Sequence, residues 1–267
     1  MKNDLKWMML SDVDGTLLRK EYPITEKAKE NARRLMIHGV GLGIATGRSP
    51  ISTADIAKLL DVNAPSILYG GAMIYDYKNK AVLWQAPMGS SAKQLIIDIS
   101  ETYPDVSILA YTDKGIWMFN PNDLVLDRGV RQEVKAALND RRIAGDILKF
   151  TLCGPRESLE KVYKAFFLTG ANKFSFASQH FAEVVGKNAG KGIAMKELSR
   201  LVKIPLDQFI VMGDGENDIE MFEKAGTCFA VGNAIKKLKN MAHHILPNCI
   251  DDGAAAGFDK AIELIRR

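Results

Sequence analysis

Two pairs of aspartates stand just after short apolar runs in the sequence. Asp12 and Asp14 follow the run WMMLS, and Asp214 and Asp218 follow FIVMG. Side chains two positions apart share a face while the chain is extended, and Gly15 then permits a tight turn. Neighbouring carboxylates repel each other unless a cation or a proton intervenes, and Mg²⁺ prefers such hard oxygen ligands. A single aspartate would more simply cap a helix or face water, but two pairs favour a magnesium site.

The stretch GKNAGKG, residues 186–192, raises a second chemical possibility. It is similar to the phosphate-binding loop of nucleotidases, which needs four residues between its glycines and a hydroxyl residue after its lysine. Here three residues separate Gly186 from Gly190, and Gly192 follows Lys191. Because the hydroxyl that would hold the metal is absent, the pattern argues against a nucleotide-binding loop of that kind.

The elements that would position these residues alternate along the chain. Five apolar runs end in small or polar residues: WMMLSDVDGT, VGLGIATGR, SILYGG, FIVMGDGEND and CFAVGNA. Helical periodicity is present over residues 25–38, 51–60, 192–202 and 217–225. Strands alternating with helices indicate a parallel sheet that is buried on both faces. Ligands of such sheets bind at the carboxyl ends of the strands, so we expect the site at that edge.

Residues 85–186 have a different pattern. A helix-like segment comes first, then two strands around a turn at Asp113–Gly115, a further strand, a helix opened by Pro155, and the hairpin KFSFASQHFAEVV. Paired strands grouped with helices indicate an α+β domain with an antiparallel sheet. We therefore expect a discontinuous α/β core made of residues 1–84 and 187–267, with residues 85–186 inserted into it.

The composition of the 267 residues is that of an ordinary globular protein, with 47% hydrophobic and 25% charged residues. The net charge of +4 comes without a long basic run, so no nucleic-acid partner is expected. No stretch reaches roughly 18 apolar residues, and the first residues lack a signal-peptide pattern, so no membrane association is expected. Three cysteines are scattered along the chain without a paired motif, which favours a reduced, cytoplasmic protein.

Taken together, the motifs resemble those of the haloacid dehalogenase (HAD) superfamily, specifically its Cof-type sugar-phosphatase-like hydrolases with a large inserted (type II) cap. DVDGTLL is similar to the first motif, ATGR to the second, the lysine of GKG to the third, and GDGENDIEMF to the fourth. VGNA and DDGAAAGF also match this subfamily. The resemblance implies a Rossmann-like α/β core with an inserted α+β cap, and a Mg²⁺-dependent phosphatase of small phosphorylated metabolites.

The resemblance also implies roles for the acidic residues. Asp12 would attack phosphorus and form an aspartyl phosphate, because covalent catalysis divides one difficult displacement into two. Asp14 would protonate the leaving alkoxide and later accept a proton from the hydrolytic water. The Asp12 side chain, the Asp14 main-chain carbonyl and the Asp214 side chain would hold Mg²⁺. Asn217 and Asp218 would support the phosphate, the metal or its bound water.

The remaining motifs imply contacts with the phosphoryl group. The hydroxyl of Thr46 and the amide of Gly47 would hold its oxygens, which is what phosphoryl transfer chiefly requires of a protein. Thr46 could equally serve as the N-cap of a helix starting near Ser49. Arg48 could contact substrate or pair with a carboxylate of the core, and both readings stay open. The ammonium of Lys191 would offset charge on Asp12 and the phosphoryl oxygens.

Two departures from the subfamily remove no assigned catalytic group, and the one at Gly70 concerns substrate preference. Gly190 stands where serine is more common before the lysine, and Gly70 of YGGA stands where asparagine is common. A cap over the site would exclude water and select the substrate, which the resemblance implies to be a sugar phosphate or a related monoester. Two alternatives remain: a sugar phosphomutase of the same fold, and a non-catalytic regulatory binding protein. The sequence gives no indication of oligomeric state.

Overall fold

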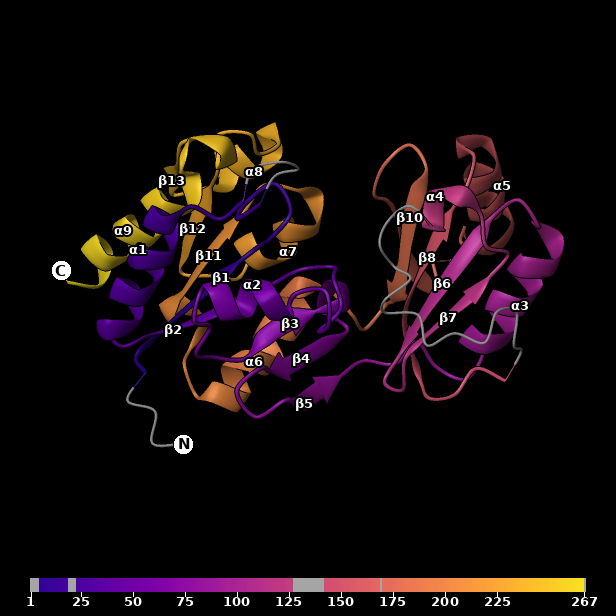
Figure 1. Ribbon diagram of the computed structural model, residues 1–267, viewed down its shortest axis with the longest axis horizontal. Helices are drawn as coiled ribbons and strands as arrows, with labels where there is room; N and C mark the ends of the chain where they lie inside the picture. The colour runs from indigo at the N-terminus through magenta and orange to yellow at the C-terminus, as the bar shows by residue number, and fades with distance from the viewer. Residues whose placement is uncertain (1–4, 19–22, 127–141, 169, 267) are drawn as a thin grey trace. The chain divides into compact units, whose positions relative to one another are not determined.

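The computed structural model describes residues 5–18, 23–126, 142–168 and 170–266 (Figure 1). The chain divides into two compact units. Unit 1 consists of Met1–Trp84 together with Gly190–Arg267, and unit 2 consists of Gln85–Ala189. In the described part of the chain, no helix combines the length and apolar character needed to cross a membrane.

Unit 1 is built on a parallel sheet with the strand order β13-β12-β11-β1-β2. Its strands are β1 (Trp7–Ser11), β2 (Val40–Ile44), β11 (Phe209–Gly213), β12 (Thr227–Ala230) and β13 (His244–Ile245). Every residue of β2 and of β11 is buried, which agrees with their uninterrupted apolar sequences. Strand β1 lies between β11 and β2, so the chain continues from β1 to β2 on one side and later adds β11 on the other. This reversal at β1 is the switch point at which α/β sheets bind ligands.

Helices pack around this sheet. They are α1 (Glu26–Ile37), α2 (Ala54–Leu59), α6 (Lys191–Val202), α7 (Ile219–Phe222), α8 (Lys236–Met241) and α9 (Gly253–Ile265). Helix α1 begins after Thr25, whose hydroxyl accepts the amide of Ala28 at 3.1 Å. It lies alongside α9 (Figure 1), where the Asn31 amide donates to the carbonyl of Ala255 and the carboxylate of Asp259.

The predicted helix over residues 217–225 is shorter in the structure. Glu216–Asp218 form a 3₁₀ turn, and the α-helix begins at Ile219. The tight turn brings the Asp218 carboxylate back to the amides of Asp214 and Gly215, at 3.0 and 3.1 Å. A side chain that binds the preceding backbone amides in this way competes with continuous helix.

A small antiparallel sheet continues from β2. Its strands are β3 (Ser66–Leu68), β4 (Met73–Asp76) and β5 (Ala81–Gln85), in the order β3-β4-β5. A parallel bridge between Ala45 and Ile67 joins β3 to the end of β2. Between β3 and β4, Tyr69, Gly70 and Gly71 all have positive φ, of 52°, 67° and 96°. Glycine adopts this conformation readily, so the YGG segment allows a reversal that two larger residues would resist.

Unit 2 has an antiparallel sheet with the order β7-β6-β8-β10-β9. Its elements are α3 (Ala92–Thr102), β6 (Ser107–Thr112), β7 (Ile116–Phe119), α4 (Asp123–Leu126), β8 (Ile147–Cys153), α5 (Arg156–Phe166), β9 (Asn172–Phe176) and β10 (Phe181–Gly186). Alternate residues of β8, including Phe150 and Leu152, join a core with Ile96 of α3 and Leu159 of α5. The predicted strand pair around Asp113–Gly115 is confirmed.

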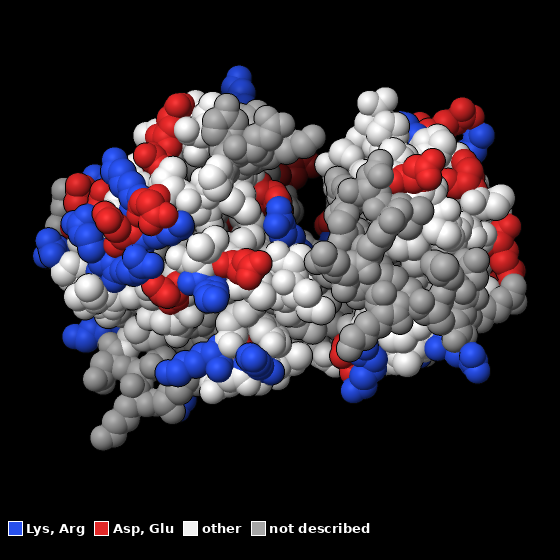
Figure 2. Space-filling view, in the orientation of Figure 1, with Lys and Arg blue, Asp and Glu red and all other residues white. Residues whose placement is uncertain are grey.

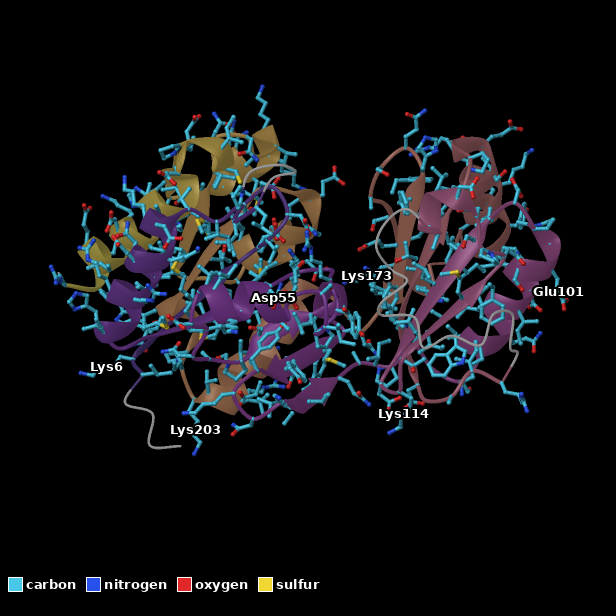
Figure 3. All side chains as sticks on the ribbon, in the orientation of Figure 1. Lys6, Asp55, Glu101, Lys114, Lys173 and Lys203 are labelled. Atoms are coloured by element: carbon cyan, nitrogen blue, oxygen red, sulfur yellow. The ribbon has the colours of Figure 1, made fainter. Side chains whose placement is uncertain are left out.

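The surface of unit 1 is polar and mixed in charge. Figure 2 shows basic and acidic side chains close together on the visible face of this unit rather than gathered by sign. Figure 3 shows the labelled side chains of Lys6 and Lys203 at the edge of unit 1. The chemically informative charges are instead buried at the carboxyl ends of β1 and β11.

Candidate active site

The sheet of unit 1 brings the predicted residues to one edge. Asp12 follows β1, Thr46 follows β2, and Asp214 follows β11, and these three strands are neighbours. Lys191 is the first residue of α6, whose N-cap Gly190 has φ of 154°. Parallel strands end on the same side of a sheet, so residues separated by up to 202 positions meet there.

Lys191 lies at the centre of this arrangement. Its Nζ donates to Asp12 Oδ1 at 2.6 Å and to Asp218 Oδ1 at 2.7 Å. The three side chains are almost inaccessible, with exposed fractions of 1% for Lys191, 5% for Asp12 and 0% for Asp218. Charges so deeply buried need partners, because each would otherwise lose its hydration without compensation.

Burial and neighbouring charge act in opposite directions on the pKa values of this pair. Burial raises the pKa of Asp12, Lys191 opposes the rise, and the carboxylates of Asp218 and Asp214 reinforce it. Burial lowers the pKa of Lys191, but Asp12 and Asp218 outweigh burial and raise it above its ordinary value. The pKa of Lys191 therefore favours its charged form, whereas the raised pKa of Asp12 makes this carboxylate easier to protonate than an exposed aspartate.

Asp218 has both of its carboxylate oxygens engaged. Oδ1 accepts from Lys191, and Oδ2 accepts from the amides of Asp214 and Gly215. A Cβ on Gly213 would lie 2.6 Å from this carboxylate, so the close approach requires glycine there. Asp218 thus orients the lysine and the loop after β11.

Asp12, Asp214 and Asp218 form an acidic group in which one oxygen from each lies within 4.8 Å of the others. Asp214 Oδ1 accepts from the Thr16 hydroxyl at 3.1 Å, and burial followed by the charge of Asp218 raises the pKa of Asp214 to about 6. A Cβ on Gly15, whose φ is 86°, would lie 2.3 Å from Asp214 Oδ2. Hard oxygen donors, mutual repulsion and a glycine-lined approach fit a divalent cation.

The carboxylate of Asp14 is not part of this acidic group among the described residues. It accepts two hydrogen bonds from Arg48: Nε to Oδ2 at 2.8 Å and Nη2 to Oδ1 at 2.5 Å. Of the two readings left open for Arg48, this structure contains the pair with a core carboxylate. Asp14 is exposed, whereas Asp12 is buried, so the two aspartates of the first motif have contrasting surroundings.

Thr46 is buried, and its amide donates to the carbonyl of Ile67 at 2.9 Å. Its hydroxyl accepts the amide of Arg48 at 3.3 Å. The prediction that Thr46 could cap a helix is wrong, because α2 begins only at Ala54 and its N-cap is Thr53. The intervening residues form turns, which leave Thr46 in the loop at the end of β2.

Two predicted phosphate contacts are more exposed. Gly47 is half-buried beside Thr46, and Asn217 is exposed in the 3₁₀ turn after β11. Thr16 and Asn233 also belong to the loops at this edge, although neither was predicted as a site residue from its motif. Thr16 binds Asp214, and Asn233 donates its amide to the carbonyl of Gly15 at 2.8 Å. Their polar character immediately after apolar runs was the available signal.

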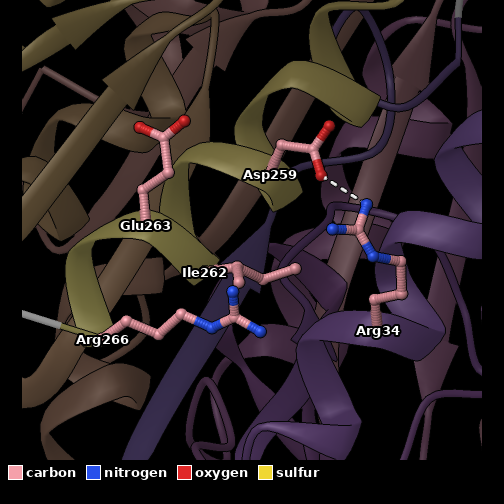
Figure 4. A pocket seen from close by; sticks show the side chains of 5 residues that line it. All are labelled: Arg34, Asp259, Ile262, Glu263 and Arg266. Carbon is pink, nitrogen blue, oxygen red and sulfur yellow. Dashed lines mark hydrogen bonds and ion pairs between the residues drawn. The ribbon is translucent and has the colours of Figure 1, made fainter.

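A hollow of about 530 Å³ lies elsewhere on unit 1 (Figure 4). It is lined by residues of α1 and α9 and by the residue after α9: Arg34, Asp259, Ile262, Glu263 and Arg266. Arg34 Nη1 and Asp259 Oδ1 form an ion pair at 2.9 Å across it. None of the predicted site residues lines this hollow, so it is separate from the candidate active site.

The family model of the haloacid dehalogenase-like hydrolases matches residues 9–258, and the chain belongs to this family. Among its relatives is the 5-amino-6-(5-phospho-D-ribitylamino)uracil phosphatase YitU of Bacillus subtilis, which is 22% identical and is aligned over 93% of this chain and 95% of its own. The HMP-PP phosphatase of Escherichia coli O6:H1 is 24% identical, over 88% of this chain and 87% of its own. These matches confirm the resemblance drawn from the motifs.

Solved structures agree in fold. A haloacid dehalogenase-like hydrolase from Bacteroides thetaiotaomicron superposes with a TM-score of 0.84 at 23% identity, covering 95% of this chain and 98% of its own. The HAD subclass IIB sugar phosphatase BT4131 superposes with a TM-score of 0.79 at 21% identity, covering 97% and 99%. The predicted fold, an α/β core with an inserted α+β domain, is confirmed.

Proposed function

We propose that this protein is a phosphatase that hydrolyses small phosphorylated metabolites through an aspartyl phosphate on Asp12. The observation that carries the proposal is the buried ion-paired group in which Lys191 contacts both Asp12 and Asp218 at the carboxyl ends of β1 and β11. A buried lysine held against a carboxylate can offset the charge that accumulates when that carboxylate meets a phosphoryl group. The names of the two relatives above, both phosphatases, support the same reaction class.

The proposed reaction has two displacements at phosphorus. In the first, an oxygen of Asp12 bonds to phosphorus, the bond to the leaving alkoxide breaks, and Asp14 gives that alkoxide a proton. In the second, a water oxygen bonds to phosphorus, Asp14 takes a proton from the water, and the bond to Asp12 breaks. Inorganic phosphate leaves, and both aspartates return to their initial states.

Asp12 and Asp214 are the side chains proposed to hold Mg²⁺, together with the main-chain carbonyl of Asp14. Asp218 takes a supporting role, because Lys191 and two backbone amides already occupy its oxygens. When bound, Mg²⁺ supplies positive charge that offsets the carboxylates and the phosphoryl oxygens. Thr16 orients Asp214 for this role through its hydroxyl.

The phosphoryl oxygens are proposed to bind the Thr46 hydroxyl, the Gly47 amide and the Lys191 ammonium, with Asn217 in reach of substrate, whereas the guanidinium of Arg48 is paired with Asp14. Residues 1–84 and 187–267 carry the chemistry in this proposal, and residues 85–186 serve as a cap that selects the substrate. The relative YitU, which is named for a phosphorylated ribitylamino compound, favours a sugar phosphate or a related monoester. The proposed location is the cytoplasm.

The first test is the release of inorganic phosphate from p-nitrophenyl phosphate and a panel of sugar phosphates. Wild type and Asp12→Asn are each assayed with Mg²⁺ and with EDTA. We expect release that requires both the metal and Asp12. Asp55→Asn is a matched control, because Asp55 is an exposed aspartate of α2 (Figure 3), and it is expected to retain full activity.

Other results would separate the alternatives. Phosphate release that persists in Asp12→Asn would exclude the proposed nucleophile. Turnover of a sugar monophosphate into its isomer, dependent on a bisphosphate activator, would identify a phosphomutase instead. A folded wild type that binds Mg²⁺ but releases no phosphate from any substrate would favour a binding protein.

A further inference from the structure

The carboxylate of Asp14 has one hydrogen-bonding side-chain partner in the described part of the chain, the guanidinium of Arg48. Nε donates to Oδ2 at 2.8 Å, and Nη2 donates to Oδ1 at 2.5 Å. A bidentate pair of this kind sets the plane of a carboxylate as well as its distance, because the guanidinium is planar and its donors form a rigid fork. Arg48 therefore determines where the two oxygens of Asp14 point.

The backbone of Asp14 does not by itself determine the direction of its carboxylate. Its backbone is held by a bridge to Leu18, and the next amide, of Gly15, donates to the Leu18 carbonyl at 2.5 Å. The side chain itself is 60% exposed, whereas that of Asp12 is 5% exposed. An exposed aspartate without a partner samples several rotamers, so a fixed backbone alone would leave the carboxylate undirected.

Arg48 is anchored on the loop after β2. Its amide donates to Thr46 Oγ1 at 3.3 Å, and its carbonyl accepts the amide of Tyr69 at 3.1 Å. The guanidinium thus extends from a backbone position fixed on both sides, with 35% of the side chain exposed. An ion pair this accessible contributes little to stability, so the pair's consequence is expected in activity rather than in folding.

We propose that Arg48 is a positioning residue that directs the carboxylate of Asp14, rather than a ligand of the phosphoryl group. This inference rests on the proposed function, in which Asp14 transfers a proton to the leaving oxygen as its bond to phosphorus breaks. An alkoxide leaving group needs that proton, whereas p-nitrophenolate departs without one. Loss of Arg48 should therefore affect the two kinds of substrate unequally.

The test compares kcat/KM for p-nitrophenyl phosphate and for a hexose phosphate in wild type and Arg48→Ala. A positioned general acid contributes about 10²–10⁴-fold, so we expect Arg48→Ala to lower kcat/KM for the hexose phosphate by about tenfold or more. For p-nitrophenyl phosphate we expect a change within about threefold, and inhibition by inorganic phosphate should be unchanged. Equal losses for both substrates, together with weaker inhibition by phosphate, would show that Arg48 binds the phosphoryl group and would overturn the proposal.

A double-mutant cycle gives an independent test. If Arg48 acts through Asp14, Arg48→Ala should have little further effect on kcat/KM for the hexose phosphate in an Asp14→Asn background, since the group that it positions is gone. If the two losses multiply, Arg48 acts on something other than Asp14, and the proposal fails. Arg48→Lys keeps the positive charge but loses the forked pair of donors, so its kcat/KM for the hexose phosphate is expected to lie between those of wild type and Arg48→Ala. Arg48→Lys replaces Arg48→Ala in these tests if Arg48→Ala does not fold.

Arg33→Ala is the matched control, because it removes another exposed arginine–aspartate pair of unit 1, that with Asp61 at 2.7 Å. It is expected to leave both kcat/KM values unchanged. Failure of the proposed function gives a different result from failure of this inference. If the proposed function is wrong, wild type releases no phosphate or Asp12→Asn remains active, whatever the activity of Arg48→Ala.

Discussion

Asn233 donates its side-chain amide to the main-chain carbonyl of Gly15 at 2.8 Å, joining two loops that are 218 positions apart. Its side-chain oxygen accepts the amide of Cys249, also at 2.8 Å. One carboxamide therefore ties the loop after β12 both to the first motif and to the turn before α9. Because the Gly15 carbonyl precedes Thr16, which binds Asp214, Asn233 stabilises the backbone around the proposed metal ligands.

Replacing Asn233 should weaken this part of unit 1. Asn233→Ala leaves a carbonyl and an amide without these partners, so we expect a loss of about 1–3 kcal/mol in the free energy of unfolding. Mg²⁺ affinity, measured by calorimetry, should fall as well. Asn63→Ala would not be a neutral comparison, since Asn63 accepts the amide of Leu42. The exposed Asn217 gives a better control for stability, and an equal loss in Asn217→Ala would contradict this account.

Lys191→Met should be severely destabilising without Mg²⁺. The substitution keeps most of the side-chain volume but leaves Asp12 and Asp218 buried and facing each other without the intervening cation. Breaking a buried ion pair in this way costs about 3–5 kcal/mol, to be measured by denaturant unfolding in EDTA. Lys29→Met removes a lysine that pairs with the exposed Glu26, and it should change stability by no more than about 0.5 kcal/mol. Similar losses in the two variants would refute the central role of Lys191.

Gly71 tests the close contact between the YGG turn and the start of α6. Its φ is 96°, and a Cβ there would lie 2.1 Å from the carbonyl carbon of Gly190. Gly71→Ala should therefore cost about 2–4 kcal/mol through backbone strain and a clash with main-chain atoms that cannot rotate away.

Gly89→Ala is the control for Gly71→Ala, because Gly89 has a nearly identical φ of 95° with nothing within 4 Å of its would-be Cβ. It should show the cost of strain alone, about 1–2 kcal/mol. Thermal unfolding of both variants measures the difference. If Gly71→Ala is no worse than Gly89→Ala, the contact with Gly190 is not the constraint.

Mg²⁺ binding should release protons below neutral pH. Burial raises the pKa of Asp12, and that of Asp214 is raised to about 6, so the metal-free protein holds protons that a cation must displace. Calorimetry in two buffers of different ionisation heat should detect more proton release at pH 6 than at pH 9. Asp12→Asn should reduce the release at pH 6. Equal release at both values would show that these carboxylates are already ionised.

The raised pKa of Asp12 also determines how the stability of the metal-free protein depends on pH in EDTA. The raised pKa means that folded Asp12 keeps its proton at pH values where the unfolded chain has lost it. Folding is then less favoured as pH rises from the ordinary carboxyl value of 3.8 through the raised pKa. The thermal midpoint of the metal-free protein should fall across this range, and the midpoint of Asp12→Asn should fall less. A midpoint that rises with pH in both proteins would contradict the shift.

The sheet of unit 1 could be predicted because its strands are uninterrupted apolar runs, such as VGLGI in β2 and FIVMG in β11. The helix over residues 217–225 was predicted too long, since periodicity does not reveal that the Asp218 side chain folds back onto its own loop. Likewise, the prediction of an N-cap at Thr46 depended on where α2 begins. Turns follow Arg48, so the helix begins only at Ala54.

For the site, the convergence of Asp12, Lys191 and Asp218 follows from parallel strands that end at one edge. Spacing along the sequence could not show whether Arg48 contacts substrate or pairs with a carboxylate, because its partner Asp14 lies 34 positions away. Nor could sequence spacing show that the side chains of Thr16 and Asn233 form hydrogen bonds between separate loops. Their partners depend on how separate loops approach each other, which only the folded structure specifies.

The division of unit 1 into two stretches of sequence has a consequence for the order in which the protein is synthesised. Strand β1 lies between β2 and β11, and β11 belongs to the second stretch, which begins at Gly190. A nascent chain that has left the ribosome only as far as residue 189 has made all of unit 2 but lacks Lys191, Asp214 and the strand that covers one edge of β1. The inserted unit can therefore fold first, since domains generally fold as units during synthesis. The proposed phosphate chemistry requires Lys191 and Asp214, which are both translated only after unit 2.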